Sequence, residues 1–342
     1  MMKELLSVRN LSIGIYRHEK LLGSVEDISF DVYPGEIVGL VGESGSGKSL
    51  TALSIPGLLD EGKKITGGSI LFSGHDSGGA DSTEALKLLE LSEKELQQIR
   101  GRDISIIFQE PFSTLNPMMK IGDQIAETLK LHGENDHKRN KNRVEELLFK
   151  LKFLNPEKIL NTYPHRLSGG MCQRVMIALA VICKPRLLIA DEPTTALDQD
   201  TQEQILGLMK EINRDLGTSI LFISHDLSVI KSLCTRLMVM YSGRILEEGK
   251  TADIFMNPAH EYTRGLLDSV PNIAHKGRDL AAIPGKIPSL EEGQPPGCPF
   301  HPRCKEVRAE CREKFPSRRK FGPDHNTCCI LYGAEIDPGE DQ

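Results

Sequence analysis

Short hydrophobic runs recur along the chain and predict its strands. Hydrophobic and polar residues alternate over 6–16 and 24–32, and a shorter run follows a glycine pair at 69–73, as in half-buried antiparallel strands. Continuous hydrophobic runs are typical of buried parallel strands and occur at 37–41, 104–108, 187–190, 219–223 and 237–240. With helices between these runs, the sequence predicts an α/β fold with a mainly parallel core sheet, flanking helices and a smaller N-terminal antiparallel sheet.

Two further stretches complete this outline. Helical spacing dominates residues 112–182, which we expect to form a helical subdomain, whereas the Gly-, Ser- and Asp-rich stretch 74–82 predicts a loop. At 342 residues, the chain exceeds the usual size of a single hydrophobic core, so we expect a second, smaller unit.

Composition narrows the class of protein. The 39% of hydrophobic and 26% of charged residues are typical of a folded chain, and the net charge of −6 argues against a protein that coats nucleic acid. The longest uncharged hydrophobic run, Val175–Cys183, is far shorter than the roughly 20 residues that cross a bilayer. The N-terminus lacks the hydrophobic core of a signal peptide. We therefore expect a cytosolic chain with reduced cysteines.

A phosphate-binding loop is predicted at 42–49, where GESGSGKS fits the P-loop pattern between a predicted strand and a predicted helix. Glycines let such a loop wrap closely around phosphate, so that backbone N–H groups face the anion. Lys48 is expected to reach the β- and γ-phosphates, and the Ser49 hydroxyl to ligate Mg²⁺. The candidate ATP-binding residues of this region are Gly42, Ser44, Gly45, Gly47, Lys48, Ser49 and Thr51.

A pair of carboxylates ends the predicted strand 187–190, where Asp191 and Glu192 follow the hydrophobic run. Ligands bind at the carboxyl ends of parallel strands. Asp191 is therefore placed to hold Mg²⁺ through water, and Glu192 to orient and polarise an attacking water. Alone, the pair fits an ordinary solvated strand end equally well. Together with the P-loop, it indicates an NTP hydrolase.

Further motifs resemble those of ATP-binding-cassette (ABC) ATPases, in the order of that family. LSGGMCQR at Leu167–Arg174 resembles the signature motif, and matches to other motifs place Gln109 in IIFQEPF, Asp198 in TTALD and His225 in LFISHDL. Ser168 is also a good helix N-cap. The helix that follows is expected to bury one stripe, made of Met171, Val175, Ala178, Leu179 and Ile182.

This resemblance implies a role for each matched residue. Gln109 is implied to link nucleotide and Mg²⁺ to a membrane partner, His225 to contact the γ-phosphate, and Asp198 to contact the opposite subunit of a dimer. The signature residues are implied to contact the ATP held by that opposite subunit, and they are Ser168, Gly169 and Gly170. Because the chain has one P-loop, a complete ATPase would need a second cassette.

The adenine-stacking residue is the least defined position. Members of the family stack adenine on an aromatic residue from an early strand, and Tyr16 is the candidate. Ile15 occupies the position that the spacing favours, and Tyr16 fits a surface aromatic equally well.

Longer stretches are similar to the ATPases of peptide and nickel import. They are FQEPFSTLNPMMKIGDQIAE at 108–127, NPAHEYTRGLL at 257–267 and IPGKIPSL at 283–290. The resemblance implies an ATPase domain over 1–255 and a C-terminal extension over 256–342. It also implies a subunit that lies at the cytoplasmic face of the cell membrane and powers import of di- and oligopeptides. Its partners would be a second ATPase subunit, two permease subunits and, indirectly, an extracytoplasmic peptide-binding protein, with no nucleic acid.

Two other functions stay open from the sequence. One is a nickel-importing ABC ATPase, and the other is a soluble ABC ATPase that acts on nucleic acid. Salt-sensitive DNA binding would favour the second of these, and co-purification with membrane subunits would exclude it.

Four cysteines near the C-terminus have the spacing C-x5-C-x6-C-x17-C, and they are Cys298, Cys304, Cys311 and Cys329. The spacing differs from the paired C-x2-C of a zinc ribbon, and four thiolates can hold a [4Fe–4S] cluster. Zinc, a disulfide or no ligand are the alternatives. The pattern also resembles the four-cysteine motif of many peptide-import ATPases, some of which bind such a cluster. By that match Cys329 is the fourth ligand, and the adjacent Cys328 is not a ligand.

The surroundings of these cysteines carry two more expectations. Four prolines predict a small, irregular, cysteine-rich domain. Residues 298–325 include eight Lys or Arg and four Asp or Glu, and this excess of positive charge would offset the charge of a thiolate-bound cluster. The segment lies outside every ATPase motif. We therefore expect it to have a structural or redox-sensing role. Replacing Cys298 or Cys311 should destabilise the segment but leave nucleotide affinity nearly unchanged.

Overall fold

A computed structural model of the chain describes residues 3–75, 85–195, 197–269, 283–285 and 293–335. Most of the predicted loop 74–82 and the end of the stretch 283–290 lie outside the described residues. The chain forms two compact units. Unit one comprises Met1–Leu6, Val32–Glu36 and Leu71–Leu221, and unit two comprises Ser7–Asp31, Ile37–Ile70 and Phe222–Gln342.

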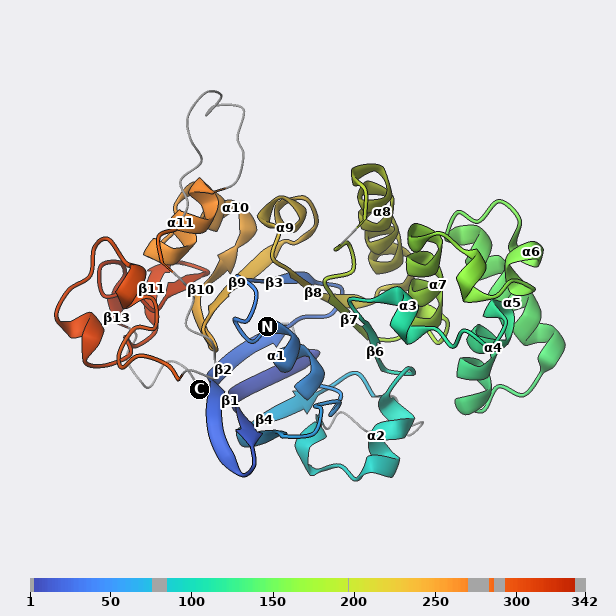
Figure 1. The fold of residues 1–342 in the computed structure, drawn as a ribbon, viewed down its shortest axis with the longest axis horizontal. Helices are drawn as coiled ribbons and strands as arrows, with labels where there is room; N and C mark the ends of the chain where they lie inside the picture. The colour runs from blue at the N-terminus through green and yellow to red at the C-terminus, as the bar shows by residue number, and fades with distance from the viewer. Residues whose placement is uncertain (1–2, 76–84, 196, 270–282, 286–292, 336–342) are drawn as a thin grey trace. The chain divides into compact units, whose positions relative to one another are not determined.

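Unit one contains most of the helices (Figure 1). Its elements are β5 (Leu86–Lys87), α2 (Glu93–Ile99), β6 (Ile104–Ile107), α3 (Pro111–Thr114), α4 (Ile121–Leu131), α5 (His137–Lys150), α6 (Pro156–Leu160), α7 (Gly169–Val181), β7 (Leu187–Asp191) and α8 (Gln199–Leu216), and β8 (Ser219–Ser224) begins there. Strands β6 and β7 pair in parallel, with Ile104 opposite Leu187. Helices α3 to α7 confirm the helical pattern predicted over 112–182.

The signature helix α7 differs from its prediction. Met171 and Leu179 of the expected stripe are only partly buried, while Cys172, Met176 and Ile177 are buried on other sides of the helix. Helices α3, α4, α5 and α8 and strand β6 all pack against α7, so little of its circumference faces solvent. A helix buried on several sides has no single hydrophobic stripe, which is why the periodic pattern was misleading.

Unit two is built mainly from strands (Figure 1). Its elements are β1 (Leu6–Arg17), β2 (Lys20–Val32), β3 (Ile37–Val41), α1 (Lys48–Ser54), β4 (Lys63–Phe72), α9 (Leu227–Leu233), β9 (Arg236–Tyr241), β10 (Arg244–Lys250), α10 (Thr251–Met256), α11 (Glu261–Asp268), β11 (Arg319–Gly322), β12 (His325–Thr327) and β13 (Ala334–Glu335). Strands β2, β1 and β4 are neighbours in one sheet. In the other, β3 pairs in parallel with β9, which pairs antiparallel with β10.

Strand β4 begins at Lys63, six residues before the run that predicted it. Its first residues are mostly exposed and polar, so they lack hydrophobic alternation. The glycine pair lies inside the strand rather than before it. A Cβ atom at Gly68, whose φ is +94°, would lie 2.6 Å from the Arg9 carbonyl oxygen, so glycine permits the close approach of β1.

The C-terminal segment extends this second sheet. Strands β12, β11 and β13 follow β10 in an antiparallel arrangement, which corrects the prediction of an irregular tail. Pro316 lies outside these strands, and Pro323 lies in the two-residue turn between β11 and β12, where no ladder hydrogen bond is lost.

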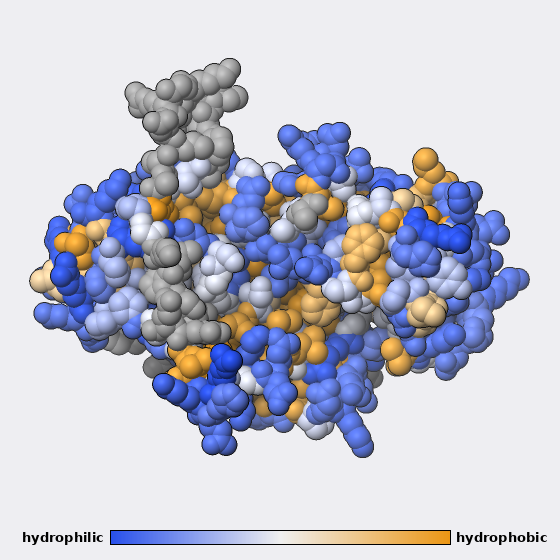
Figure 2. All heavy atoms as spheres, in the orientation of Figure 1, coloured by the Kyte–Doolittle hydropathy of each residue, from blue (hydrophilic) through white to orange (hydrophobic). Residues whose placement is uncertain are grey.

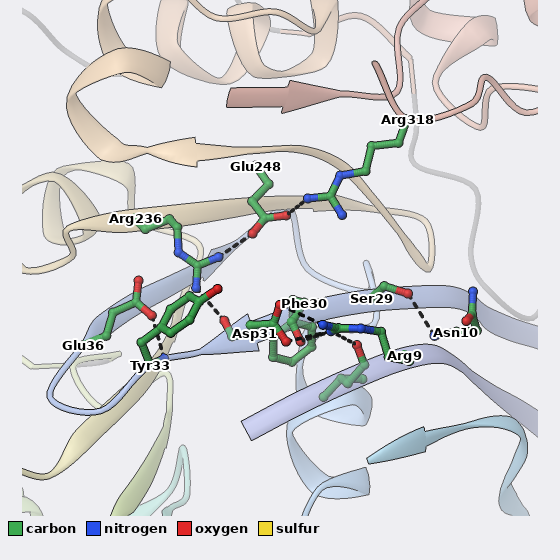
Figure 3. A network of polar contacts seen from close by, with 11 residues as sticks. Arg9, Asn10, Ser29, Phe30, Asp31, Tyr33, Glu36, Arg236, Glu248 and Arg318 are labelled. Atoms are coloured by element: carbon green, nitrogen blue, oxygen red, sulfur yellow. Dashed lines mark hydrogen bonds and ion pairs between the residues drawn. The ribbon is translucent and has the colours of Figure 1, made fainter. Parts of the chain in front are cut away.

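An arginine network also ties the tail to the sheet (Figure 3). Arg318 donates to the Glu248 carboxylate of β10 at 2.6 Å, and Arg236 of β9 pairs with the same carboxylate. Arg236 also donates to the carbonyl oxygen of Asp31 in β2. One basic residue of the cysteine-containing stretch 298–325, Arg318, therefore pairs with a carboxylate of the sheet.

Most of the described residues visible on the face drawn in Figure 2 are hydrophilic, with hydrophobic residues between them. None of the helices in the described part of the chain has the length and apolar composition to cross a membrane.

Candidate active site

The phosphate loop joins β3 to α1, as predicted, within unit two. A Cβ atom at Gly42 would lie 2.1 Å from the Met240 carbonyl oxygen, so only glycine fits there. Gly47 has a φ of +103°, a conformation that other residues rarely adopt. Ser44, Gly45 and Ser49 are exposed along the loop and its exit into the helix.

Lys48 lies inside this loop. Its Nζ atom donates to the carbonyl oxygens of Gly42, at 2.9 Å, and Glu43, at 3.1 Å, and the side chain is buried. Thr51 Oγ1 donates to the Gly47 carbonyl at 3.0 Å and fixes the first turn of α1. A buried ammonium beside a glycine-rich loop is suited to bind phosphate.

Two other candidates belong to unit two. His225 directly follows β8 and is exposed, at the strand end where the sequence placed it. Tyr16 is partly buried in β1, and its ring lies over Gly14, where a Cβ atom would be 2.5 Å from Tyr16 Cε2.

The acidic pair ends β7 within unit one. Asp191 is the last residue of the strand and is buried, whereas Glu192 has a φ of +48° in the left-handed region. Glu192 Oε2 accepts from Thr195 Oγ1 at 2.9 Å and from Gln109 Nε2 at 3.4 Å. The fold therefore brings Gln109 and Glu192 together from two different strand ends. Thr195 was missed, because a threonine in a loop has no pattern of its own.

The signature residues also lie in unit one. Ser168 caps α7 as predicted, because its hydroxyl accepts from the Met171 backbone N–H at 3.3 Å. A Cβ atom at Gly170 would lie 2.6 Å from Thr201 Cγ2, whereas a Cβ at Gly169 would meet nothing within 4 Å. Asp198 caps α8 by accepting from the Thr201 N–H at 2.9 Å and from its hydroxyl at 2.8 Å.

The four predicted cysteines line one small cavity in unit two, together with Cys328 and His260. The Cys298 N–H donates to the Cys311 carbonyl at 2.9 Å. A Cβ atom at Gly297, whose φ is +77°, would lie 2.3 Å from that same oxygen, so glycine allows the two segments to meet.

Burial weakens the acidity of three thiols of this cavity. Burial raises the pKa of Cys298 to about 12 and that of Cys329 to about 11, and it also raises the pKa of Cys304. All eight cysteines are free, and no group of three or more His, Cys, Asp or Glu side chains in the described ranges is arranged to hold a metal ion.

The cysteine segment also touches the phosphate loop. Arg303, directly before Cys304, pairs with the Glu43 carboxylate through Nη1–Oε2 at 2.8 Å and Nη2–Oε1 at 3.3 Å. Sequence reasoning missed this pair, since an arginine and a glutamate 260 residues apart share no pattern. The segment lies outside the ATPase motifs in the sequence, but the fold brings its Arg303 into contact with the phosphate loop.

Comparison with known proteins agrees with these motifs. The family described as ABC transporter matches residues 25–195, and the family described as oligopeptide/dipeptide transporter, C-terminal region, matches residues 246–311. The chain is 44% identical over 335 residues to the oligopeptide transport ATP-binding protein AppD of Bacillus subtilis, covering 98% of both chains. This chain belongs to the peptide ABC-transporter ATP-binding proteins. A second such relative is the dipeptide transport ATP-binding protein DppD of Bacillus subtilis, 43% identical over 96% of this chain and 95% of DppD.

Solved structures confirm the fold of this ABC ATPase. A dimeric, post-hydrolysis structure of the ATP-binding cassette MJ0796 with ADP and Pi has a TM-score of 0.61 at 27% identity, covering 72% of this chain and 98% of that chain. CbiO1 from Clostridium perfringens, part of an ABC transporter complex, has a TM-score of 0.60 at 25% identity, covering 74% and 91%. The predicted α/β cassette, with its parallel core sheet and N-terminal antiparallel sheet, is confirmed.

Proposed function

We propose that this chain is the ATP-hydrolysing subunit that powers import of di- and oligopeptides through an ABC transporter. The observation that carries the proposal is similarity to peptide-transport ATP-binding proteins over nearly the whole chain, including the C-terminal region at 246–311. In this reading, residues 1–255 form the ATPase domain and 256–342 form an extension specific to this kind of importer.

Each unit contributes groups suited to ATP hydrolysis. In unit two, Lys48 and the loop N–H groups bind the phosphates, Ser49 ligates Mg²⁺, and His225 contacts the γ-phosphate. The buried position of Lys48 at the loop supports the first of these roles. Tyr16 stays the candidate for adenine stacking. When bound, Mg²⁺ neutralises charge that develops on the phosphates.

In unit one, Asp191 holds Mg²⁺ through water, and Glu192 orients and polarises the water that attacks the γ-phosphorus. The bond from that phosphorus to the ADP oxygen then breaks, and ADP leaves. Hydrogen bonds from Thr195 and Gln109 to Glu192 Oε2 support this role, because they fix the plane of the carboxylate. The left-handed backbone of Glu192 supports it too, since strain of about 1–3 kcal/mol collects at functional positions.

The signature residues Ser168, Gly169 and Gly170 serve the nucleotide of a second ATPase subunit, and Asp198 contacts that subunit. The open space around Gly169 supports this arrangement, because no atom of the described residues lies within 4 Å of a Cβ placed there. Gly170 differs, because it packs on Thr201.

Substituting the two signature glycines should separate these roles. Gly170→Ala should lower the free energy of unfolding by about 1–3 kcal/mol, because its Cβ overlaps Thr201 Cγ2, and Thr201→Ser in the same chain should restore it. Gly169→Ala should leave that free energy within about 0.5 kcal/mol but lower ATP turnover of the dimer. Denaturant unfolding and phosphate release measure the two effects. Normal turnover by the Gly169→Ala dimer would exclude the shared nucleotide.

The membrane partners would be two permease subunits at the cytoplasmic face of the membrane, supplied by an extracytoplasmic peptide-binding protein. The exposed side chains of Phe112 and Met118 support a partner contact next to Gln109, since they are 56% and 83% exposed. Large exposed apolar side chains that lie near each other in the sequence, here one in α3 and one in the turn that follows, are typical of interaction surfaces.

The test is purification of the chain with its permease subunits and reconstitution in vesicles. We expect ATP hydrolysis to rise when peptide-loaded binding protein is added, and the isolated chain at low concentration to hydrolyse ATP slowly. Stimulation by nickel-loaded binding protein instead would favour nickel import. DNA-stimulated hydrolysis that weakens with salt, without any permease, would favour a nucleic-acid ATPase.

The cysteine cavity would hold a [4Fe–4S] cluster through Cys298, Cys304, Cys311 and Cys329. Their common cavity supports this ligand set. Four thiolates are also the ligand set that such a cluster uses.

A further inference from the structure

Two parts of the C-terminal extension hold a single residue of the phosphate loop. Tyr262, in α11, accepts the Glu43 backbone N–H at its Oη atom at 2.9 Å. Arg303, between Cys298 and Cys304, binds the Glu43 side chain at two oxygens. The backbone and the carboxylate of the same residue are thus fixed from outside the loop.

The groups that hold Glu43 are themselves rigid. Tyr262 is fully buried, with its ring centroid 4.6 Å from Tyr241 and 5.3 Å from Phe300. The Arg303 side chain is 5% exposed, and its Nε donates to the Pro284 carbonyl at 2.9 Å. Both side chains therefore have little freedom to release Glu43 without a shift of α11 or of the cysteine segment.

The charge of Glu43 makes this arrangement relevant to ATP. Glu43 is the second residue of the loop that is proposed to bind the triphosphate, and its side chain is 25% exposed. An uncompensated carboxylate there would repel the triphosphate. Arg303 cancels that charge, and its two parallel hydrogen bonds also fix the direction of the carboxylate.

We propose that Arg303 and Tyr262 are positioning residues for ATP binding, through which the cysteine segment holds the phosphate loop in its binding conformation. The inference rests on the proposed role of the loop at 42–49 in binding ATP. It assigns to the C-terminal extension a direct influence on nucleotide affinity.

The experiment compares MgATP and MgADP binding by calorimetry to the full-length chain and its variants. Arg303→Met should weaken MgATP binding about tenfold and MgADP binding less, because the unpaired Glu43 carboxylate repels the more charged nucleotide more strongly. Glu43→Gln added to Arg303→Met should recover MgATP affinity to within about threefold of wild type, since it removes the unpaired charge. Tyr262→Phe should weaken MgATP binding about threefold by removing the acceptor of the Glu43 N–H.

Arg318→Met is the matched control. It removes another arginine of the same segment that pairs with a carboxylate, Glu248, away from the loop. Its MgATP affinity should stay within about twofold of wild type. A purely structural role would weaken both nucleotides equally and would not be rescued by Glu43→Gln.

Thermal unfolding of each variant checks that it is folded. If Arg303→Met does not fold, the double variant and Tyr262→Phe decide the question. Wild-type affinity in Arg303→Met, or in Tyr262→Phe where the former does not fold, would overturn the inference. Equal losses in Arg303→Met and Arg318→Met would overturn it as well. A wild-type chain that binds no MgATP would instead overturn the proposed function.

Discussion

Replacing Glu192 with glutamine should lower ATP hydrolysis by at least about 100-fold while leaving MgATP affinity within about twofold. Glutamine keeps the size of the side chain and a polar atom for Thr195 and Gln109, but it cannot polarise the attacking water as a carboxylate does. The P-loop and Asp191 are unchanged, so binding survives. Phosphate release by the assembled transporter and calorimetry of the chain measure the two quantities.

The matched control for this variant is Glu203→Gln, an exposed glutamate of α8 with no assigned role. Its hydrolysis rate should equal that of wild type. A wild-type rate in Glu192→Gln would show that Glu192 is not the residue that activates water. An equal loss of MgATP binding and hydrolysis would place Glu192 in nucleotide binding instead.

The parts of the fold and site that could be predicted have local signals. The P-loop has fixed glycine spacing and a strand and a helix on its two sides, and β3 matched its hydrophobic run residue for residue. Ser168 was identified as a cap because a serine before a hydrophobic helical run has a short-range reason to be there. In each case the residues that define the structure are neighbours in the sequence.

The parts that could not be predicted depend on distant partners. Arg303 looks like one more basic residue of the tail, and only the fold brings it to Glu43. The strands of the tail are two to four residues long, too short for an alternating pattern to emerge. Helix α7 is surrounded by other elements, so its sequence lacks the one-sided stripe of a surface helix.

A cluster bound in the cysteine cavity would be coupled to the phosphate loop. Arg303 directly precedes Cys304 and also binds Glu43, so a backbone shift at Cys304 would act on the residue that holds Glu43. Loss of cluster ligands should therefore weaken nucleotide binding, in contrast to the independence that the sequence suggested. The cluster, if bound, would act on ATP through structure rather than through chemistry at the phosphates.

Protein purified without oxygen should contain about four irons and four acid-labile sulfides per chain, and Cys304→Ser should lose nearly all of them. Serine at one of the four ligand positions leaves one iron without a thiolate in a buried cavity. No other side chain of the described residues is proposed to replace that thiolate. The matched controls are Cys328→Ser, next to the ligand set, and Cys183→Ser, in unit one. Both variants should contain as much iron as the wild-type chain. Iron, sulfide and zinc are measured on the same samples. If the wild-type chain contains one zinc and no sulfide, the cavity holds a structural zinc ion and not a cluster. If Cys304→Ser keeps its iron, Cys304 is not a ligand.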